Sequence, residues 1–416
     1  MAKPYIISAL DIGSGFLKMV VVSKKRGEKD FEILGFNKEP SAGVRKGVVV
    51  DVQRATEKIS LLTKKIEQEC GRKIINIYAN ISGGHIFYTL SRGLVSVSRA
   101  DQQISEEDVD RVLKAAKAIS ISPNKEIIEI LPKEFIVDGE TGVKEPVGMA
   151  GVRLEAETLL ICGFSPYIKN TTQAILRAGL QINDLIVNPL ASAKAVLTSR
   201  EKELGVCVLD IGTATTSMAV FEEGNLIQTA IFPIGSSHIT NDIAICLKTD
   251  IDTAEKIKLE FGTSDLNHFK SKKEEKKISL SYQNKKSEKE ENISFSKKDL
   301  TKIIGARISE IFDLVNKELK KISKQKMLPA GIVLTGGGAK MPKIKELAKN
   351  NLKLPCRLGG PKVPSNFQED LSLSVLYGLI LEGIEIEEGE EIVSDFNKKE
   401  KSGLRKFLSF FKNLIP

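Results

Sequence analysis

The chain has 416 residues, of which 41% are hydrophobic and 28% are charged, and its formal net charge is +8. This composition is typical of a globular protein large enough for two or more domains, and it excludes a disordered chain. No apolar run reaches the roughly 18 residues that a membrane-spanning helix needs, and residues 1–13 lack the layout of a signal peptide. We therefore expect the protein to stay in the cytoplasm.

The distribution of charge, cysteine and histidine argues against two further classes. Much of the charge lies in residues 269–299, where Lys and Glu are interspersed as on a solvated surface, so no nucleic-acid partner is predicted. The five cysteines form no CxxC pair and the three histidines have no ligand spacing. Neither a disulfide framework nor a zinc site is therefore predicted.

Residues 8–22, SALDIGSGFLKMVVV, are the first informative segment. Two short runs rich in Val, Ile and Leu predict a pair of buried strands, and the small residues between them predict a tight turn. Gly13 and Gly15 permit a positive φ and remove side chains that would block the backbone amides. Successive amides in such a turn form a concave anion site, to which Ser14 adds a hydroxyl donor and Lys18 a positive charge.

Residues 84–165 predict a small α+β unit. Ser105, followed three positions later by Asp108, is typical of a helix start. The predicted helix has an apolar stripe formed by Val109, Val112, Leu113 and Ala116. Strand-like runs follow at 126–137 and 157–163.

Residues 207–221, CVLDIGTATTSMAVF, repeat the pattern of the first hairpin. Gly212 again follows the aspartate closely, and Thr213, Ala214 and Thr215 complete the turn with two hydroxyl donors among them. Two ordinary hairpins with Asp and Gly in their turns are the alternative. Two matched copies, each opening one half of the chain, favour a pair of phosphate-binding turns instead.

The aspartates of these two turns need a separate explanation. A carboxylate beside a phosphate is repelled unless a cation lies between them. Mg²⁺ is often held by only one or two carboxylates together with phosphate oxygens. Asp11 and Asp210, one from each turn, are therefore predicted to hold Mg²⁺ through water.

A third glycine cluster lies in residues 330–350, AGIVLTGGGAKMPKIKELAKN. The pattern predicts a buried strand, a turn at Gly336, Gly337 and Gly338, and then an amphipathic helix. A triple glycine directly after a strand lets a flat ring pack against the backbone, and Lys340 is grouped with this site. The segment matches neither the P-loop nor the Rossmann fingerprint.

Two Asp-x-Gly hairpins for phosphate and a late triple-glycine turn resemble the actin/Hsp70/sugar-kinase superfamily. The resemblance implies a duplicated α/β ATPase unit that closes on ATP and Mg²⁺, and it explains why the hairpin occurs twice. The segment KEPVGMAGVRLEAE, residues 144–157, resembles an insert of the FtsA family of bacterial cell-division proteins. Further stretches between residue 5 and about residue 383 are similar to that family.

This resemblance implies an actin-like duplicated two-domain fold with an FtsA-type α+β subdomain insert and a C-terminal amphipathic helix. The charge blocks after residue 384 predict a flexible linker before that helix. The expected boundaries are 1–83 and 166–199 for the first half (1A), 84–165 for the insert (1C), 200–236 and 325–384 for the second half (2A), 237–324 for subdomain 2B, 385–401 for the linker and 402–416 for the helix.

The resemblance also implies roles for residues of the second half. Glu255 and Lys258 match a family helix near the adenosine. In the family, subdomain 2B binds the C-terminal peptide of FtsZ, the tubulin-like division protein. Lys297, Lys298 and Arg307 are candidate contacts for that acidic peptide, and a solvated helix surface is the alternative.

Hydrolysis is expected to be slow or negligible. Asn188 lies where actins place a water-orienting glutamine, and its neighbours supply no evident general base. Thr213, Ala214 and Ser217 replace two glycines and an aspartate of the family's second phosphate turn. Because alanine tolerates a positive φ poorly, a shifted turn is expected.

Residues 402–416 predict an interfacial helix. Apolar residues take one helical face and cations the other, as in helices that bind an anionic membrane surface. The residues expected to bind the membrane are Leu404, Arg405, Lys406, Phe407, Leu408, Phe410, Phe411, Lys412, Leu414 and Ile415. The alternative is a helix that docks on its own domain.

Together these features predict an ATP-binding, actin-like cell-division protein, peripheral on the cytoplasmic face of the membrane at the division site. The resemblance implies that it polymerises with itself, tethers FtsZ filaments and helps to recruit later divisome membrane proteins. One alternative is a pilus-assembly actin-like ATPase. A small-molecule kinase of the same fold is less favoured, because it has no use for the amphipathic tail.

Overall fold

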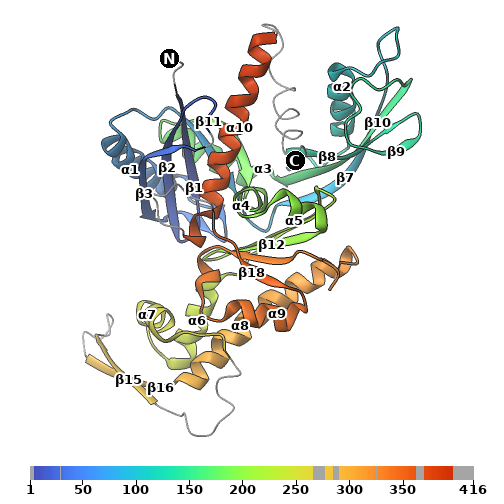
Figure 1. Cartoon of the computed structure of the whole chain (residues 1–416). Coiled ribbons are helices and arrows are strands. Elements are labelled where there is room, and N and C mark those ends of the chain that lie inside the picture. The colour runs from blue at the N-terminus through green and yellow to red at the C-terminus, as the bar shows by residue number, and fades with distance from the viewer. Residues whose placement is uncertain are drawn as a thin grey trace.

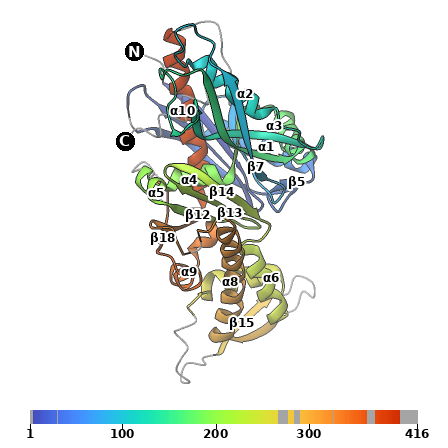
Figure 2. The ribbon, with the colours of Figure 1, turned by 90° about the vertical axis from the view of Figure 1, so that its right-hand side faces the viewer.

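The computed structural model of the protein describes residues 4–28, 30–265, 277–283, 290–324, 326–361 and 370–396. Each half of the chain is built on a five-stranded sheet, and a four-stranded sheet with its own helix projects from the first half (Figure 1). The second half extends away from the first along the long axis of the molecule (Figure 2).

The two five-stranded sheets have the same topology, which confirms the predicted duplication. In each, three consecutive strands form an antiparallel meander, and two later strands add in parallel beside the first strand of the meander. The first sheet has the order β11 (Gln181–Val187), β6 (Asn76–Ile81), β1 (Tyr5–Ile12), β2 (Phe16–Lys24), β3 (Glu32–Pro40). The second has the order β18 (Cys356–Leu358), β17 (Gly331–Thr335), β12 (Val206–Ile211), β13 (Thr216–Glu222), β14 (Asn225–Phe232).

Helices cover both faces of the first sheet, so its central strands are apolar on both sides. Leu10 and Ile12 of β1 face α1 (Val52–Cys70) and α3 (Ser165–Arg177). Ile7 and Ala9 face the opposite way, toward α4 (Asn188–Val196) and α10 (Ser374–Phe396). The remaining elements of this half are the short strands β4 (Val44–Arg45) and β5 (Val48–Val49), and helix α5 (Ser199–Leu204) follows α4.

One apolar core unites the second sheet with its helices. These helices are α6 (Ser236–Leu247), α7 (Ile251–Phe261), α8 (Lys297–Lys321) and α9 (Ile344–Leu352). Two short 3₁₀ helices, η1 (Gly337–Lys340) and η2 (Leu371–Leu373), and a hairpin of β15 (Lys277–Gln283) and β16 (Glu290–Ser296) complete this half. A separate core joins the halves, because Ala193 and Val196 of α4 pack with Val208 and Val333 of the second sheet.

The predicted α+β insert is confirmed. Its sheet has the order β7 (Phe87–Ser96), β10 (Arg153–Phe164), β8 (Lys125–Val137), β9 (Glu140–Val143), and α2 (Glu106–Lys117) packs on it. Ser105 and Asp108 form the predicted capping box at the start of α2. Val109, Val112 and Ala116 are buried as predicted, and Leu113 is half-buried.

Helix α10 continues to Phe396, whereas the sequence predicted a flexible linker from residue 385. The acidic residues that suggested a linker have partners in the first half. Glu385 lies 2.5 Å from Lys194 and Glu388 lies 3.1 Å from Lys24. These contacts hold the charged part of the helix on the protein. Among the described residues, no helix is both long and apolar enough to cross a membrane.

Candidate functional site

The two predicted hairpin turns lie against each other. Residues 13–15 join β1 to β2, and residues 212–215 join β12 to β13. A Cβ atom on Gly15 would lie 2.5 Å from the hydroxyl oxygen of Thr213. The fold therefore brings the two halves of the chain into contact at the residues that the sequence singled out.

The two turns close with equivalent hydrogen bonds. Gly13 donates its N–H to the carbonyl of Phe16 over 3.2 Å, and Gly212 donates to the carbonyl of Thr215 over 2.8 Å. Neither Gly13 nor Gly15 has a positive φ, although glycine permits one. A Cβ atom on Gly13 would lie 2.7 Å from the Phe16 carbonyl oxygen, so the first turn needs glycine for close approach rather than for backbone freedom.

The substitutions in the second turn do not strain it. Neither Thr213 nor Ala214 has a positive φ, so alanine is not strained in this turn. Ser217 lies opposite Asp210 in the hairpin and is buried. In the first turn, the Ser14 hydroxyl accepts the N–H of Gly47 over 2.8 Å, and its own hydrogen is left to donate.

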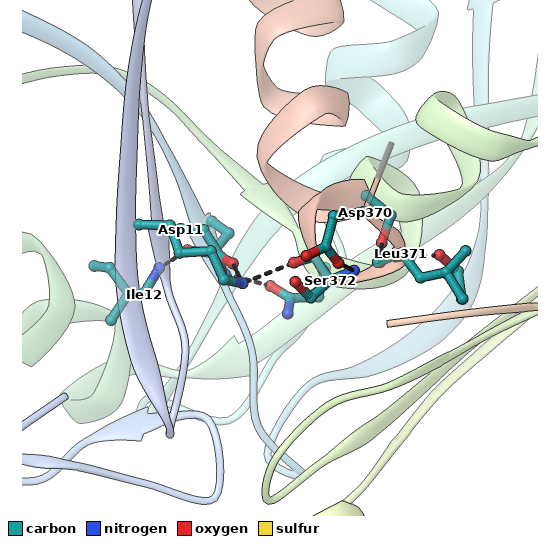
Figure 3. Close-up of polar contacts among 10 residues, drawn as sticks. Asp11, Ile12, Asp370, Leu371 and Ser372 are labelled. Atoms are coloured by element: carbon teal, nitrogen blue, oxygen red, sulfur yellow. Dashed lines mark hydrogen bonds and ion pairs between the residues drawn. The ribbon is translucent and has the colours of Figure 1, made fainter. Parts of the chain in front are cut away.

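Asp11 is held from two sides. Its Oδ2 atom accepts a hydrogen bond from the Lys18 ammonium over 2.8 Å, and its Oδ1 atom accepts one from the Asn80 amide over 2.9 Å. Lys18 also donates to the carbonyl of Ser372 over 2.8 Å. Figure 3 shows Asp11 and the turn of residues 370–372 approaching each other from opposite sides.

Asp210 has different surroundings. Burial and, to a lesser extent, the charge of Asp11 raise the pKa of its carboxyl, Lys18 partly offsets them, and the net pKa is about 7. No described residue donates a hydrogen bond to this carboxylate. A Cβ atom on Gly336, whose φ is 85°, would collide with Asp210 Oδ1, so the triple-glycine turn leaves room for the carboxylate.

Asp11 and Asp210 are the residues that could hold a divalent cation. Both are buried, at 4% and 7% exposure, and they stand at equivalent ends of their strands. The described residues contain no cluster of three or more His, Cys, Asp or Glu suited to a metal. Two carboxylates without further protein ligands fit Mg²⁺ that arrives with phosphate oxygens.

The triple-glycine turn packs on the second hairpin, and the segment before α10 packs on the turn. A Cβ atom on Gly338 would collide with Ile211, and Gly336 donates its N–H to the carbonyl of Leu371 over 3.0 Å. Lys340 forms an ion pair of 2.6 Å with Asp370. The predicted residues Gly336, Gly337, Gly338 and Lys340 therefore lie together at the site.

Glu255 and Lys258 of α7 lie beside the start of α6. Lys258, which is buried, is 2.7 Å from Glu255 and donates to the Thr240 hydroxyl over 2.9 Å. The first turn of α6 in turn contacts the second hairpin, since Ser236 donates its N–H to the carbonyl of Gly212 over 2.9 Å. Both predicted residues therefore belong to the surroundings of the second turn.

Two groups of residues at the candidate site were missed by the sequence analysis. Asn80 interrupts the apolar run at residues 77–81 of β6, and its nitrogen contacts both Asp11 and Asn188, the latter over 2.7 Å. The turn of residues 370–372 reaches both halves, through Lys18 and Lys340. A polar residue inside a buried strand is a usable signal, whereas nothing local marks the second group.

The candidate peptide contacts lie apart from one another on α8. Lys297 and Lys298 begin the helix, and Arg307, ten residues later, lies about 15 Å along its axis. The guanidinium of Arg307 makes two hydrogen bonds to Asp242, of 2.6 and 2.7 Å, and one to Glu310 of 2.5 Å. An acidic peptide would therefore have to compete with these carboxylates for Arg307.

The predicted membrane-binding residues lie outside the described residues. They are Leu404, Arg405, Lys406, Phe407, Leu408, Phe410, Phe411, Lys412, Leu414 and Ile415.

Two facing hairpins on duplicated sheets, with a glycine turn packed on one of them, define an actin-like protein. Solved structures agree. The "PilM-PilN type IV pilus biogenesis complex" has a TM-score of 0.64 at 17% identity, covering 91% of this chain and 98% of that one. MreB5 of Spiroplasma citri bound to ADP has a TM-score of 0.55 at 12% identity, covering 94% and 99%. At these identities the likeness shows the fold alone.

Sequence comparisons identify the family. Residues 207–378 match the family model "Cell division protein FtsA", and residues 83–162 match "SHS2 domain inserted in FTSA". Cell division protein FtsA of Pseudomonas aeruginosa is 35% identical over 356 residues, 86% of this chain and 83% of that protein. The FtsA protein of Borreliella burgdorferi is 35% identical over 379 residues, 90% of each. The chain belongs to the FtsA family of cell division proteins.

Proposed function

We propose that this protein is an ATP- and Mg²⁺-binding adaptor of cell division, which polymerises on the cytoplasmic face of the membrane and tethers FtsZ filaments to it. In this role it also helps to recruit later divisome membrane proteins. The observation that carries the proposal is the approach of two equivalent aspartate hairpins, with the triple-glycine turn packed on the second. The relatives named cell division protein FtsA support the biological role.

Different residues of the site bind different parts of the nucleotide. Asp11 and Asp210 hold Mg²⁺ through water, and the turn amides with Lys18 bind the phosphates. The hydroxyls of Ser14, Thr213 and Thr215 add donors to the phosphates. The nucleoside lies by the second half, near Glu255, Lys258, Lys340 and the glycines 336–338. The fold neighbour MreB5 of Spiroplasma citri was solved with ADP, which supports a nucleotide as the ligand.

Turnover in this site is slow. Asn188, the candidate that orients water, carries an amide, which cannot accept a proton as a general base does. Its Oδ1 atom already accepts a hydrogen bond from Asn80. A steady-state rate above about 1 s⁻¹, at the low end of typical enzymes, would contradict this part of the proposal.

Membrane binding rests on the predicted helix at residues 402–416. Each cation near an anionic surface contributes about 1 kcal/mol, and burial of several apolar side chains adds a few more. One tail therefore binds reversibly. A filament that carries many tails binds far more tightly, because the local concentration of tails is high.

The nucleotide site is tested by a glycine substitution. Gly336→Ala places a methyl group against the Asp210 carboxylate, and we expect at least about a tenfold loss of affinity for ATP with Mg²⁺ in calorimetry. Gly179→Ala is the matched control, because Gly179 has a nearly equal φ of 87° and no atom within 4 Å of the added Cβ. Equal losses in both variants, or no binding of ATP by the unmodified protein, would refute the nucleotide site.

A further inference from the structure

Asn80 is a buried amide near the carboxyl end of β6, beside the central strand of the first sheet. Its side chain belongs to β6 and is 1% exposed. The Oδ1 atom accepts the N–H of Ile12 over 2.6 Å, and the Nδ2 atom donates to Asp11 Oδ1 over 2.9 Å and to Asn188 Oδ1 over 2.7 Å. Both donor hydrogens and the carbonyl of the amide are therefore used.

These three bonds connect the end of β1 with the start of α4. Asp11 and Ile12 close β1, and Asn188 opens α4. Asn80 fixes one oxygen of the Asp11 carboxylate while Lys18 fixes the other. These two hydrogen bonds hold the carboxylate in one orientation. Because each carboxylate oxygen has two lone-pair positions, the group can still accept a hydrogen bond from a metal-bound water.

The second half of the chain provides an internal comparison. The register of β12 and β17 places Thr335 beside Asp210, as the register of β1 and β6 carries Asn80 beside Asp11. The Thr335 hydroxyl donates to the carbonyl of Leu371 over 3.3 Å and leaves Asp210 unsupported. The two equivalent strands therefore place different residues at the aspartate, and only the first half holds its carboxylate.

We propose that Asn80 is a positioning residue of the nucleotide site, which orients Asp11 toward Mg²⁺ and holds Asn188 in line with it. The inference rests on the proposed binding of ATP with Mg²⁺. Residues that orient metal-binding groups typically change metal affinity by about 10–100-fold when they are removed. Without Asn80, the Asp11 carboxylate keeps only its hydrogen bond with Lys18 and can rotate. The hydrogen-bonded link between Asp11 and Asn188 is also lost.

The test compares ATP binding in MgCl₂ and in EDTA for the full chain. In the unmodified protein, we expect Mg²⁺ to strengthen ATP binding. We expect Asn80→Ala to reduce that strengthening by about tenfold and to leave the affinity in EDTA within about twofold. Ile77→Val, a core change on the same strand, is the matched control and should leave the strengthening by Mg²⁺ intact.

A second variant keeps the inference testable if Asn80→Ala does not fold. Asn80→Thr installs the residue that the second half has at the equivalent place, and its single hydroxyl hydrogen cannot reach both Asp11 and Asn188. It should show the same loss. An unchanged effect of Mg²⁺, or an equal loss with and without Mg²⁺, would overturn the positioning role. If the unmodified protein does not bind ATP, the proposed function fails, and the inference fails with it.

Discussion

At the scale of single residues, duplication has produced two aspartates with unlike surroundings. Asp11 accepts hydrogen bonds from Lys18 and Asn80. Asp210 is equally buried, has no donor among the described residues, and has a raised pKa because burial disfavours its charged form. A buried carboxylate of this kind costs stability until a cation arrives, which is typical of a site kept for binding rather than for folding.

Opposite effects of the two Asp→Asn changes are therefore predicted in the absence of ligands. Asp210→Asn removes an uncompensated buried charge and should raise the free energy of unfolding by about 1–3 kcal/mol. Asp11→Asn leaves the Lys18 ammonium without its counter-charge and should lower the free energy of unfolding. Urea denaturation in EDTA without nucleotide measures both. If the free energy of unfolding changes in the same direction in both variants, the proposed difference between the two carboxylates is wrong.

At the scale of elements, side-chain contacts stabilise the ends of helices, some within one segment and some between residues distant in sequence. The first turn of helix α2 contains a buried carboxylate, Asp108. Burial raises the pKa of this group, but hydrogen bonds from Ser105, Arg111 and Ser98 outweigh that effect and leave its pKa well below the ordinary value. Helix α10 continues through an acidic run, because Lys194 lies 2.5 Å from both Glu382 and Glu385.

The contribution of Asp108 should depend on pH. Since its pKa is lower in the folded protein than in the unfolded chain, its stabilisation is present above about pH 4 and is lost as the pH falls through the folded pKa. Asp108→Asn should cost about 0.5–2 kcal/mol at pH 7, and less at pH 3. Denaturation of both proteins at the two pH values measures this.

Asp110→Asn is the matched control on the same helix. Asp110 lies 4.0 Å from Lys114 and has no place in the cap, so its loss should change stability by less than about 0.5 kcal/mol. A cost for Asp108→Asn that stays constant from pH 7 to pH 3 would contradict the assigned role of the carboxylate.

At the scale of the whole molecule, the sequence predicted what is local and repeated. The paired hairpins, the triple-glycine turn and the capping box of the insert each lie in one short segment, and the structure has them all. The sequence could not reveal that Asn80 contacts Asn188, or that Lys18 contacts Ser372, which is 354 positions away. The first pairing depends on the packing of α4 beside β6 within the first half, and the second on the approach of the segment before α10 to β2, neither of which a local pattern encodes.

Two interpretations made from local residue types were incomplete. Gly13 and Gly15 were singled out partly because glycine permits a positive φ, but neither has one, and the approach of neighbouring atoms explains both. A linker was expected after residue 384, but Lys24 and Lys194 of the first half hold the charged part of α10. In both cases the residue type was interpreted locally, although a tertiary contact determines its conformation.

The most direct test of the adaptor is flotation of FtsZ with anionic vesicles, in ATP and Mg²⁺, with the full chain or a version that ends at Lys401. We expect the full chain to carry FtsZ to the vesicles, and the shortened chain to leave FtsZ in solution. If the shortened chain carries FtsZ equally well, the tail is not the anchor. If the full chain itself floats without FtsZ, the protein does not tether it, and the proposed function is wrong.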